Sequence, residues 1–235
     1  ALLYTFMVYF IPKSPRWLFL HQKEEEAKAI IKAAYNEDDA TALIKDISTE
    51  QENTPTYESI FDRKYRFILS LAFLIAFFNQ FSGINAFLYY APRIFEEGGL
   101  GESTALLSSV GIGLVNLIFT LLGINLIDKL GRKILMYIGS IGYIISLSLI
   151  AASFLLQWEG LALPLFLFLF IASHAIGQGA IIWVFISEIY PNHMRSAGQS
   201  FGTSTHWVLA AIIPSLVPVL FATIGAGIVF AVFAF

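Results

Sequence analysis

Five long stretches without a charged residue dominate the pattern of this 235-residue chain. No Asp, Glu, Lys or Arg occurs in residues 67–92, 103–127, 134–158, 160–187 or 196–235. A 25-residue helix is roughly 38 Å long, whereas the hydrocarbon core of a bilayer is about 30 Å thick. Each of the first four stretches therefore predicts one membrane-spanning helix. The fifth holds 40 residues and predicts one span plus part of a second.

Composition supports a membrane protein made of helices. The chain is 57% hydrophobic and only 13% charged, whereas about a quarter of the residues in a soluble domain carry charge. Backbone polar groups in lipid must be paired internally, and the strict alternation of a membrane barrel strand is absent, so the spans should be helical. The chain has no cysteine, which excludes disulfides and cysteine metal sites within it.

Charge predicts the orientation of these spans. Thirteen of the 14 Lys and Arg residues lie in 12–66, in 128–133 or at Arg195, and the exception is Arg93. Acidic residues occupy the alternate connections, at 96–102 and 159. By the positive-inside rule, the basic connections are cytoplasmic.

The only extended polar region covers residues 21–62. Within it, Ala27, Ile30, Ile31 and Ala34 form one apolar face of a predicted helix over 24–35. NEDDA then predicts a break, STEQENTPTYES a turn-rich tether, and residues 57–62 a further short helix. We interpret the region as a cytoplasmic helical bridge between two membrane halves; a solvated linker is the alternative.

The sequence NQFSGINAFLYYAP, residues 79–92, places many polar groups directly after an apolar run. Taken as a straight helix, it cannot direct Asn79, Gln80 and Asn85 at one point, because they lie on different faces. A break near Gly83 would bring the three amides together, and Pro92 is expected to end the helix. Interrupted helices of this kind form midplane ligand sites in transporters.

Intramembrane amides have two interpretations. A single amide, such as Asn116, commonly joins neighbouring helices for about 0.6 kcal/mol, whereas clustered amides favour a polar ligand. Gln178 lies between two glycines and is followed by Trp183, so an amide and an indole face occur close together. For His174 two roles are equally consistent with the sequence, namely a neutral packing residue and a proton carrier.

No set of residues suggests covalent chemistry. The chain has no Ser/His/Asp set, no HExxH and no phosphate-binding glycine loop, so we expect no enzyme activity, no metal and no cofactor. Neutral amides, hydroxyls and aromatic faces match a neutral polyhydroxylated ligand, because a sugar hydroxyl both donates and accepts, as an amide does. Nothing points to a nucleic acid.

Four motifs resemble the sugar porters of the major facilitator superfamily. They are PKSPRWL (12–18), NQFSGINAFLYY (79–90), DKLGRK (128–133) and WVFISEIYPNHMR (183–195). They resemble, in the family's order and spacing, the motifs after its sixth helix, in its seventh, between its eighth and ninth, and after its tenth.

The resemblance implies an all-α integral membrane fold, namely the C-terminal six-helix half of a twelve-helix carrier with a cytoplasmic helical loop. Residues 1–11 would end helix six, 12–64 would form the loop with short amphipathic helices, and 65–235 would hold helices seven to eleven and the start of helix twelve, near Gly225. The N-terminal six-helix half would be the partner of this chain, together with the bilayer.

The resemblance also assigns residues. Sugar contacts would come from Asn79, Gln80, Asn85, Asn116, Trp183 and Trp207, with Gln178 as a contact private to this chain. An aromatic pair, Tyr89 and Tyr90, would close the outer side of the site. Asp128, Arg132, Glu188 and Arg195 would form salt bridges of a cytoplasmic gate.

Three departures from the family pattern stand out. Asn79 replaces a glutamine and is one methylene shorter, Gln178 and its glycines replace a proline-bearing hinge, and Ala175 replaces a glutamate. The expected function is transport of a monosaccharide across the plasma membrane by alternating access, as a facilitator or a proton symporter. A carrier for a polyol such as inositol, or a membrane sugar sensor that does not transport, are the alternatives.

Overall fold

The computed structural model describes residues 2–53, 59–158 and 160–235, and all regular structure in these ranges is helical. The chain divides into two compact units, one on either side of residues 54–58. Each unit is described here by itself.

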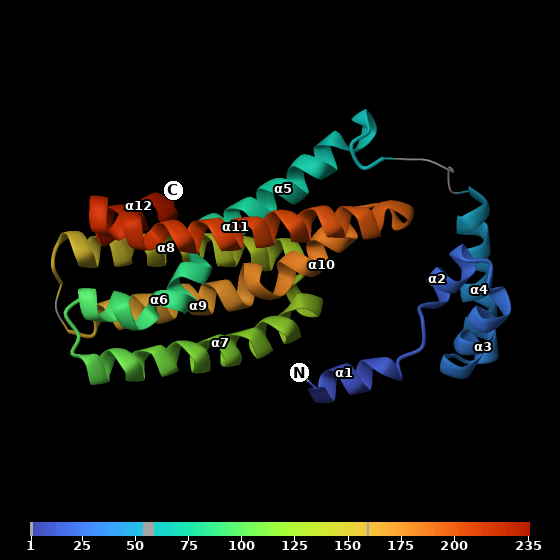
Figure 1. Cartoon of the computed structure of the whole chain (residues 1–235), viewed down its shortest axis with the longest axis horizontal. Helices are drawn as coiled ribbons and strands as arrows, with labels where there is room; N and C mark the ends of the chain where they lie inside the picture. Colours follow the sequence, from blue (N-terminus) through green and yellow to red (C-terminus); the bar gives the residue numbers. More distant parts are fainter. Residues whose placement is uncertain (1, 54–58, 159) are drawn as a thin grey trace. The chain divides into compact units, whose positions relative to one another are not determined.

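The first unit contains four helices, α1 (Leu2–Tyr9), α2 (Pro15–Leu20), α3 (Glu24–Ala34) and α4 (Glu37–Asn53). Helix α3 confirms the helix expected over 24–35, and Ala27 and Ile31 on its predicted apolar face are fully buried. They pack with Leu18 and Phe19 of α2 and with Ala40 and Ile47 of α4 in one small apolar cluster. Figure 1 shows α2, α3 and α4 side by side.

The tether expected over residues 48–59 is wrong over 48–53, because these residues belong to α4. Asn36 caps this helix: its Oδ1 accepts from the backbone N of Asp39 at 2.8 Å, and its Nδ2 donates to the Asp39 carboxylate at 2.9 Å. The rest of the expected tether, residues 54–58, lies outside the described residues, as does the start of the short helix expected over 57–62. Residues 59–62 form a turn, closed by a hydrogen bond from Asp62 N to Ser59 O, and not a helix.

The second unit is a helix bundle that begins with a 3₁₀ turn, η1 (Arg63–Tyr65). Its helices are α5 (Arg66–Phe81), α6 (Ile84–Glu97), α7 (Glu102–Leu130), α8 (Arg132–Leu155), α9 (Ala162–His174), α10 (Ala180–Glu188), α11 (Arg195–Ile224) and α12 (Ala226–Ala234). By length and composition, five segments of the described chain can cross a membrane, and they correspond to the five uncharged stretches. Helix α12 begins beside Gly225, as predicted.

The membrane-spanning segments of this unit alternate in direction, with α5 and α6 forming one segment and α9 and α10 another (Figure 1). The start of α5 and the α7–α8 and α10–α11 connections lie at one end of the bundle (Figure 1). These are the basic connections, so the arrangement agrees with the orientation expected from charge.

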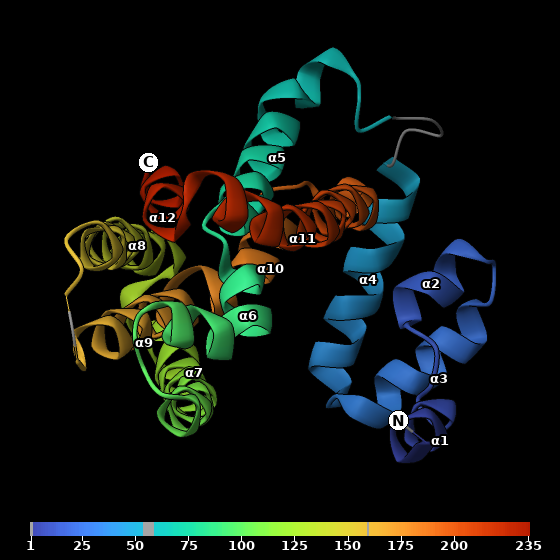
Figure 2. The same ribbon diagram turned by 60° about the vertical axis from the view of Figure 1, so that its left-hand side comes forward.

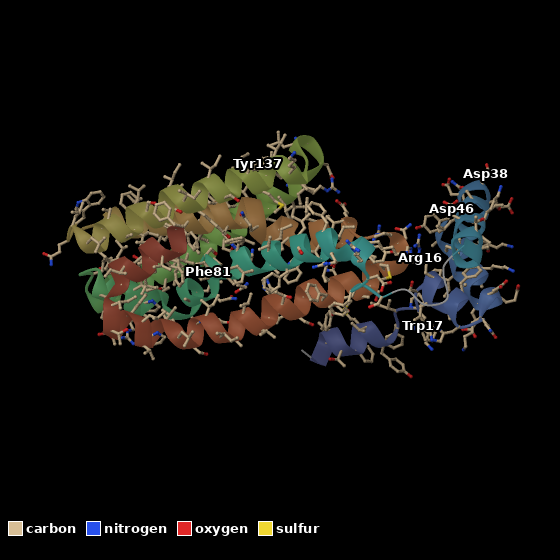
Figure 3. The ribbon with its side chains drawn as sticks, turned by 90° about the horizontal axis from the view of Figure 1, so that it is seen from above. Arg16, Trp17, Asp38, Asp46, Phe81 and Tyr137 are labelled. Carbon is tan, nitrogen blue, oxygen red and sulfur yellow. The ribbon has the colours of Figure 1, made fainter. Side chains whose placement is uncertain are left out.

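The first predicted span is broken at the expected place. Helix α5 ends at Phe81, which is labelled in Figure 3, and Gly83 has a φ of +77° before α6 begins. This left-handed conformation is open to glycine at little cost. Pro92 does not end the helix, contrary to expectation: it lies inside α6, where Tyr90 departs from helical geometry (φ −110°, ψ 16°). A proline is tolerated inside a membrane helix because neighbouring groups satisfy the backbone it frees.

A second break divides the fourth predicted span. Five residues of π-helix, η2 (Ala175–Gly179), join α9 to α10, and Gly177 has φ −91° and ψ −106°, outside the helical region. The glycines around Gln178, which stand in place of the family's proline-bearing hinge, thus lie in an interruption of the helix.

The main core of the bundle is aromatic and aliphatic. Phe87 of α6 lies 4.5 Å from Phe170 of α9 and 4.9 Å from Phe230 of α12, measured between ring centroids. Helix α12 packs along α8, and α5 packs along α11, which Figure 2 shows from a second direction. This packing places the C-terminal end of α5 and the N-terminal start of α6 against α11. The polar side chains described below lie at this point.

Candidate functional site

A buried hydrogen-bond network centres on the carboxamide of Gln80. Its Nε2 donates to Asn79 Oδ1 at 3.1 Å and lies 3.1 and 3.0 Å from the two ring nitrogens of His206. Its Oε1 accepts from Asn85 Nδ2 at 2.7 Å. We call Asn79, Gln80, Asn85 and His206 the Gln80 network; both sides of the central amide are bonded in it.

The break at Gly83 is what lets these side chains meet. Asn79 and Gln80 lie on the last turn of α5, and Asn85 lies on the first turn of α6. A continuous helix would direct Asn85 away from Gln80. The broken span instead brings all three predicted amides of this segment together.

Two indole rings extend the network. The His206 ring lies 4.6 Å from Trp183 of α10 and 5.3 Å from Trp207 on its own helix, in both cases edge to face. The predicted tryptophans therefore meet at a histidine, whose place in the site the sequence interpretation missed. A histidine beside a tryptophan in an uncharged span was the available signal.

A cavity of about 400 Å³ opens next to Trp207. Its lining comes from α6 and α11: Tyr89, Tyr90, Trp207, Ala210, Ala211, Pro214 and Ser215. This volume falls in the usual range for small-molecule sites. The structure thus brings the predicted aromatic pair of the outer side to one of the two predicted tryptophans.

Burial separates the two parts of this site. Asn79, Gln80 and His206 are each less than 10% exposed, whereas Tyr89 and Trp207 are 62% and 59% exposed. Asn85 and Trp183 are half-buried between these groups. The arrangement is a set of bonded amides behind an open aromatic surface, which suits a ligand with hydroxyl groups and apolar C–H faces.

Two predicted contacts are not brought to the Gln80 network. The Asn116 side chain, half-buried on α7, makes no hydrogen bond within the described ranges. Gln178 bonds instead to α8, through Nε2 to Ser140 Oγ at 2.7 Å and to Met136 O at 3.5 Å. It lines a second, mostly apolar cavity of about 350 Å³, which Asn79 also borders.

Each amide at this second cavity has one side unbonded. Among the described residues, no partner is present for Asn79 Nδ2 or Gln178 Oε1, and both atoms are buried. Neither amide is therefore fully satisfied by protein groups, unlike Gln80.

The predicted gate charges lie at one end of the bundle. Arg132 Nη2 lies 3.1 Å from Glu188 Oε1, joining the start of α8 to the end of α10, and Asp128 lies 3.9 Å from Arg132. Arg195 is exposed and forms no ion pair with a carboxylate that the structure describes. Tyr190 follows Glu188 by two residues, and burial raises the pKa of its hydroxyl above the usual value.

The described residues contain no group of three His, Asp or Glu side chains placed to hold a metal ion. The amides and indole rings of the site offer hydrogen bonding and aromatic contact to a neutral molecule.

Comparisons with known proteins identify the family of this chain. The family model described as "Sugar (and other) transporter" matches residues 1–235. The D-xylose-proton symporter of Escherichia coli (strain K12) is 32% identical over 88% of this chain and 42% of its own length. The glucose transporter GlcP of Staphylococcus epidermidis is 35% identical over 97% of this chain and 52% of its own.

Solved structures show the same similarity. The major facilitator superfamily proton:xylose symporter XylE bound to 6-bromo-6-deoxy-D-glucose matches with a TM-score of 0.85 and 28% identity, over 99% of this chain and 50% of that one. The inward-open xylose transporter XylE from E. coli matches with a TM-score of 0.71 and 27% identity, over 99% and 48%. The chain spans about half the length of the relatives it matches.

Proposed function

The chain belongs to the sugar transporter family of the major facilitator superfamily, and from this premise we propose that it forms the sugar-holding C-terminal half of a monosaccharide carrier that works by alternating access. It is a multi-pass protein of the plasma membrane, with the fold of one half of that superfamily's transporters, and this family transports rather than catalyses. Its partner in transport would be the six-helix N-terminal half of the same carrier.

One observation carries the proposal: the Trp207 ring lies 5.3 Å from the His206 ring of the Gln80 network and also lines the cavity of about 400 Å³, here called the aromatic cavity. A sugar leaving water must replace the hydrogen bonds of its hydroxyls, because an unpaired buried polar group costs about 1–3 kcal/mol. Asn85, at the half-buried edge of the network, can exchange its bond with Gln80 for one with a hydroxyl. Trp183 and Trp207 offer flat apolar faces for the C–H side of the ring.

In this proposal Gln80 has a double role. It is 1% exposed, so it acts first by holding Asn85 and His206 in place and contacts the sugar only when that network opens. Tyr89 and Tyr90 stand at the rim of the cavity, where they would close over a bound sugar from the outer side. Asn116 on α7 remains a proposed contact from the neighbouring helix.

The ion pair of Arg132 and Glu188 supports the gating part of the proposal. It links α8 to α10 at the basic end of the bundle, so it would hold that end closed while the outer side is open. The pair is partly exposed and contributes about 0–1 kcal/mol. That scale suffices, since conformations of a carrier differ by only a few kcal/mol.

Uptake of radiolabelled sugars into vesicles containing the complete carrier, with and without a proton gradient, tests this function. Saturable uptake of a monosaccharide supports the proposal, and dependence on the gradient selects symport over facilitation. Uptake restricted to a polyol such as inositol would assign the same site to another neutral ligand. Sugar binding without any uptake would instead indicate a sensor.

A further inference from the structure

The π turn that interrupts the span of α9 and α10 is bonded to α8 at two points. The Tyr143 hydroxyl of α8 hydrogen-bonds to Nδ1 of His174, the residue directly before the turn. Four residues later, Gln178 donates through Nε2 to Ser140 Oγ of α8 at 2.7 Å. Both partners on α8 lie within one turn of each other.

Backbone contact reinforces these bonds. A Cβ atom on Gly177 would lie 2.6 Å from Gly139 Cα, and one on Gly142 would lie 2.2 Å from Ser173 Oγ. The two helices thus touch through glycines on the same faces that carry the bonded side chains. Close approach of this kind, with polar bonds across it, is how membrane helices associate without a hydrophobic driving force.

We propose that the pairs Tyr143–His174 and Ser140–Gln178, here called the hinge clamp, fix the π turn to α8, so that Gln178 is a positioning residue of the hinge. The turn and α8 then move as one body, and bending is confined to the start of α10, after Gly179. The effect of the hinge clamp on transport rests on the proposed function. The existence of the hinge clamp is independent of that function.

The chain has a physical reason to need such a clamp. A π turn leaves one residue outside the regular helical ladder, and Gly177 departs from helical geometry altogether. No proline in η2 restricts the backbone at this point, so rigidity must come from outside the turn. The neighbouring helix α8 supplies it through hydroxyl groups and small residues.

The clamp lies apart from the aromatic cavity beside Trp207, and of the Gln80 network only Asn79 shares a cavity with it. Ser140, Tyr143 and Gln178 border the second cavity, between α5, α8, η2 and α12, whereas Trp207, Tyr89 and Tyr90 border the aromatic cavity. Removing the clamp should therefore alter how the hinge moves and leave sugar contacts in place.

The test uses the complete carrier with spin labels on introduced cysteines at Ile141 on α8 and Asn192 after α10, both exposed; this chain has no cysteine of its own. Distances between the labels are measured by pulsed electron resonance in Tyr143→Phe, Gln178→Leu and the double variant. Ser146→Ala is the matched control, because Ser146 is a buried hydroxyl of α8 that bonds only to backbone oxygens of its own helix.

We expect each clamp variant to broaden the distance distribution and the control to overlay the wild type. In Tyr143→Phe, sugar affinity should stay within about twofold, while the turnover rate changes severalfold. Distributions that overlay the wild type in the double variant would overturn the clamp. Loss of sugar binding in Gln178→Leu with an unchanged distribution would make Gln178 a sugar contact instead.

The distance measurement does not depend on the ligand. If the wild-type carrier binds no sugar, the proposed function fails while the clamp is still decided by the label distances. Tyr143→Phe keeps the aromatic ring, so a folded variant is available even where Gln178→Leu is unstable.

Discussion

Gln80 and His206 are 126 positions apart in the chain, and the Gln80 amide nitrogen lies within 3.1 Å of both nitrogens of the His206 ring. This contact joins the end of α5 to the middle of α11, two helices that pack along each other. It places a titratable ring, rather than a further amide, behind the indoles of the site. The first two predictions follow from this network.

Loss of either central amide should weaken sugar binding. We expect Gln80→Ala and Asn85→Ala each to reduce affinity by about 1–3 kcal/mol, because each leaves a hydrogen-bonding partner unpaired. Calorimetric titration of the purified complete carrier measures this. Asn125→Ala is the control, since that exposed amide bonds only to the Leu121 carbonyl of its own helix. Isotherms that coincide with the wild type in both site variants would remove the site assignment.

His206 should be replaceable by another acceptor but not by an apolar residue. His206→Leu leaves a buried Gln80 N–H without a partner, which should lower the free energy of unfolding by about 1–3 kcal/mol. His206→Gln keeps an acceptor at this position and should recover much of that loss. Thermal unfolding followed by intrinsic fluorescence compares the two, and equal melting temperatures would show that the hydrogen bond contributes nothing.

Much of the fold follows from charge alone, because a charged side chain in hydrocarbon is costly and so marks where spans cannot be. The break at Gly83 was also predictable, since one helix could not direct three amides at one point. Helix α4 was not predictable, because its polar composition resembles that of a tether. Its helical structure is explained by the Asn36 cap and by the burial of Ile47.

The direction in which the Gln178 side chain points could not be predicted from the sequence, for a different reason. A π turn adds a residue to the helix, which rotates every later side chain by about 100° relative to a regular helix. A helical wheel drawn through the glycines therefore misplaces Gln178, and the structure directs it to Ser140. The residues before the turn are unaffected by this rotation, and His174 hydrogen-bonds to the Tyr143 hydroxyl.

The Arg132–Glu188 pair predicts a shift in resting conformation. Glu188→Gln removes the charge that holds α10 to the start of α8, so we expect more carriers to face inward at rest. Accessibility labelling of cysteines at the outer cavity should fall accordingly. Glu26→Gln, which breaks a pair with Lys23 at the N-terminus of α3, serves as control. Labelling that stays at the wild-type level in Glu188→Gln would remove the gating role.

Glycine at position 177 should be irreplaceable. Gly177→Ala places a methyl group 2.6 Å from the Gly139 backbone, which no side-chain rotation relieves, so we expect a loss of about 1–3 kcal/mol in stability. Gly113→Ala is the matched comparison, because a methyl group there meets nothing within 4 Å. The free energy of unfolding in mixed micelles is the measurement, and indistinguishable values for the two variants would contradict the close packing seen here.

The joint at Gly83 has a last consequence for energetics. Asn85 lies on one side of it and Gln80 on the other, so the 2.7 Å bond between them acts as a crosslink across the joint. A sugar hydroxyl that accepts a hydrogen bond from Asn85 in place of Gln80 removes that crosslink. Helices α5 and α6 can then change the angle between them. Sugar binding and the angle between α5 and α6 are then thermodynamically linked. Because linkage is reciprocal, any change that alters this angle also changes the affinity for the sugar.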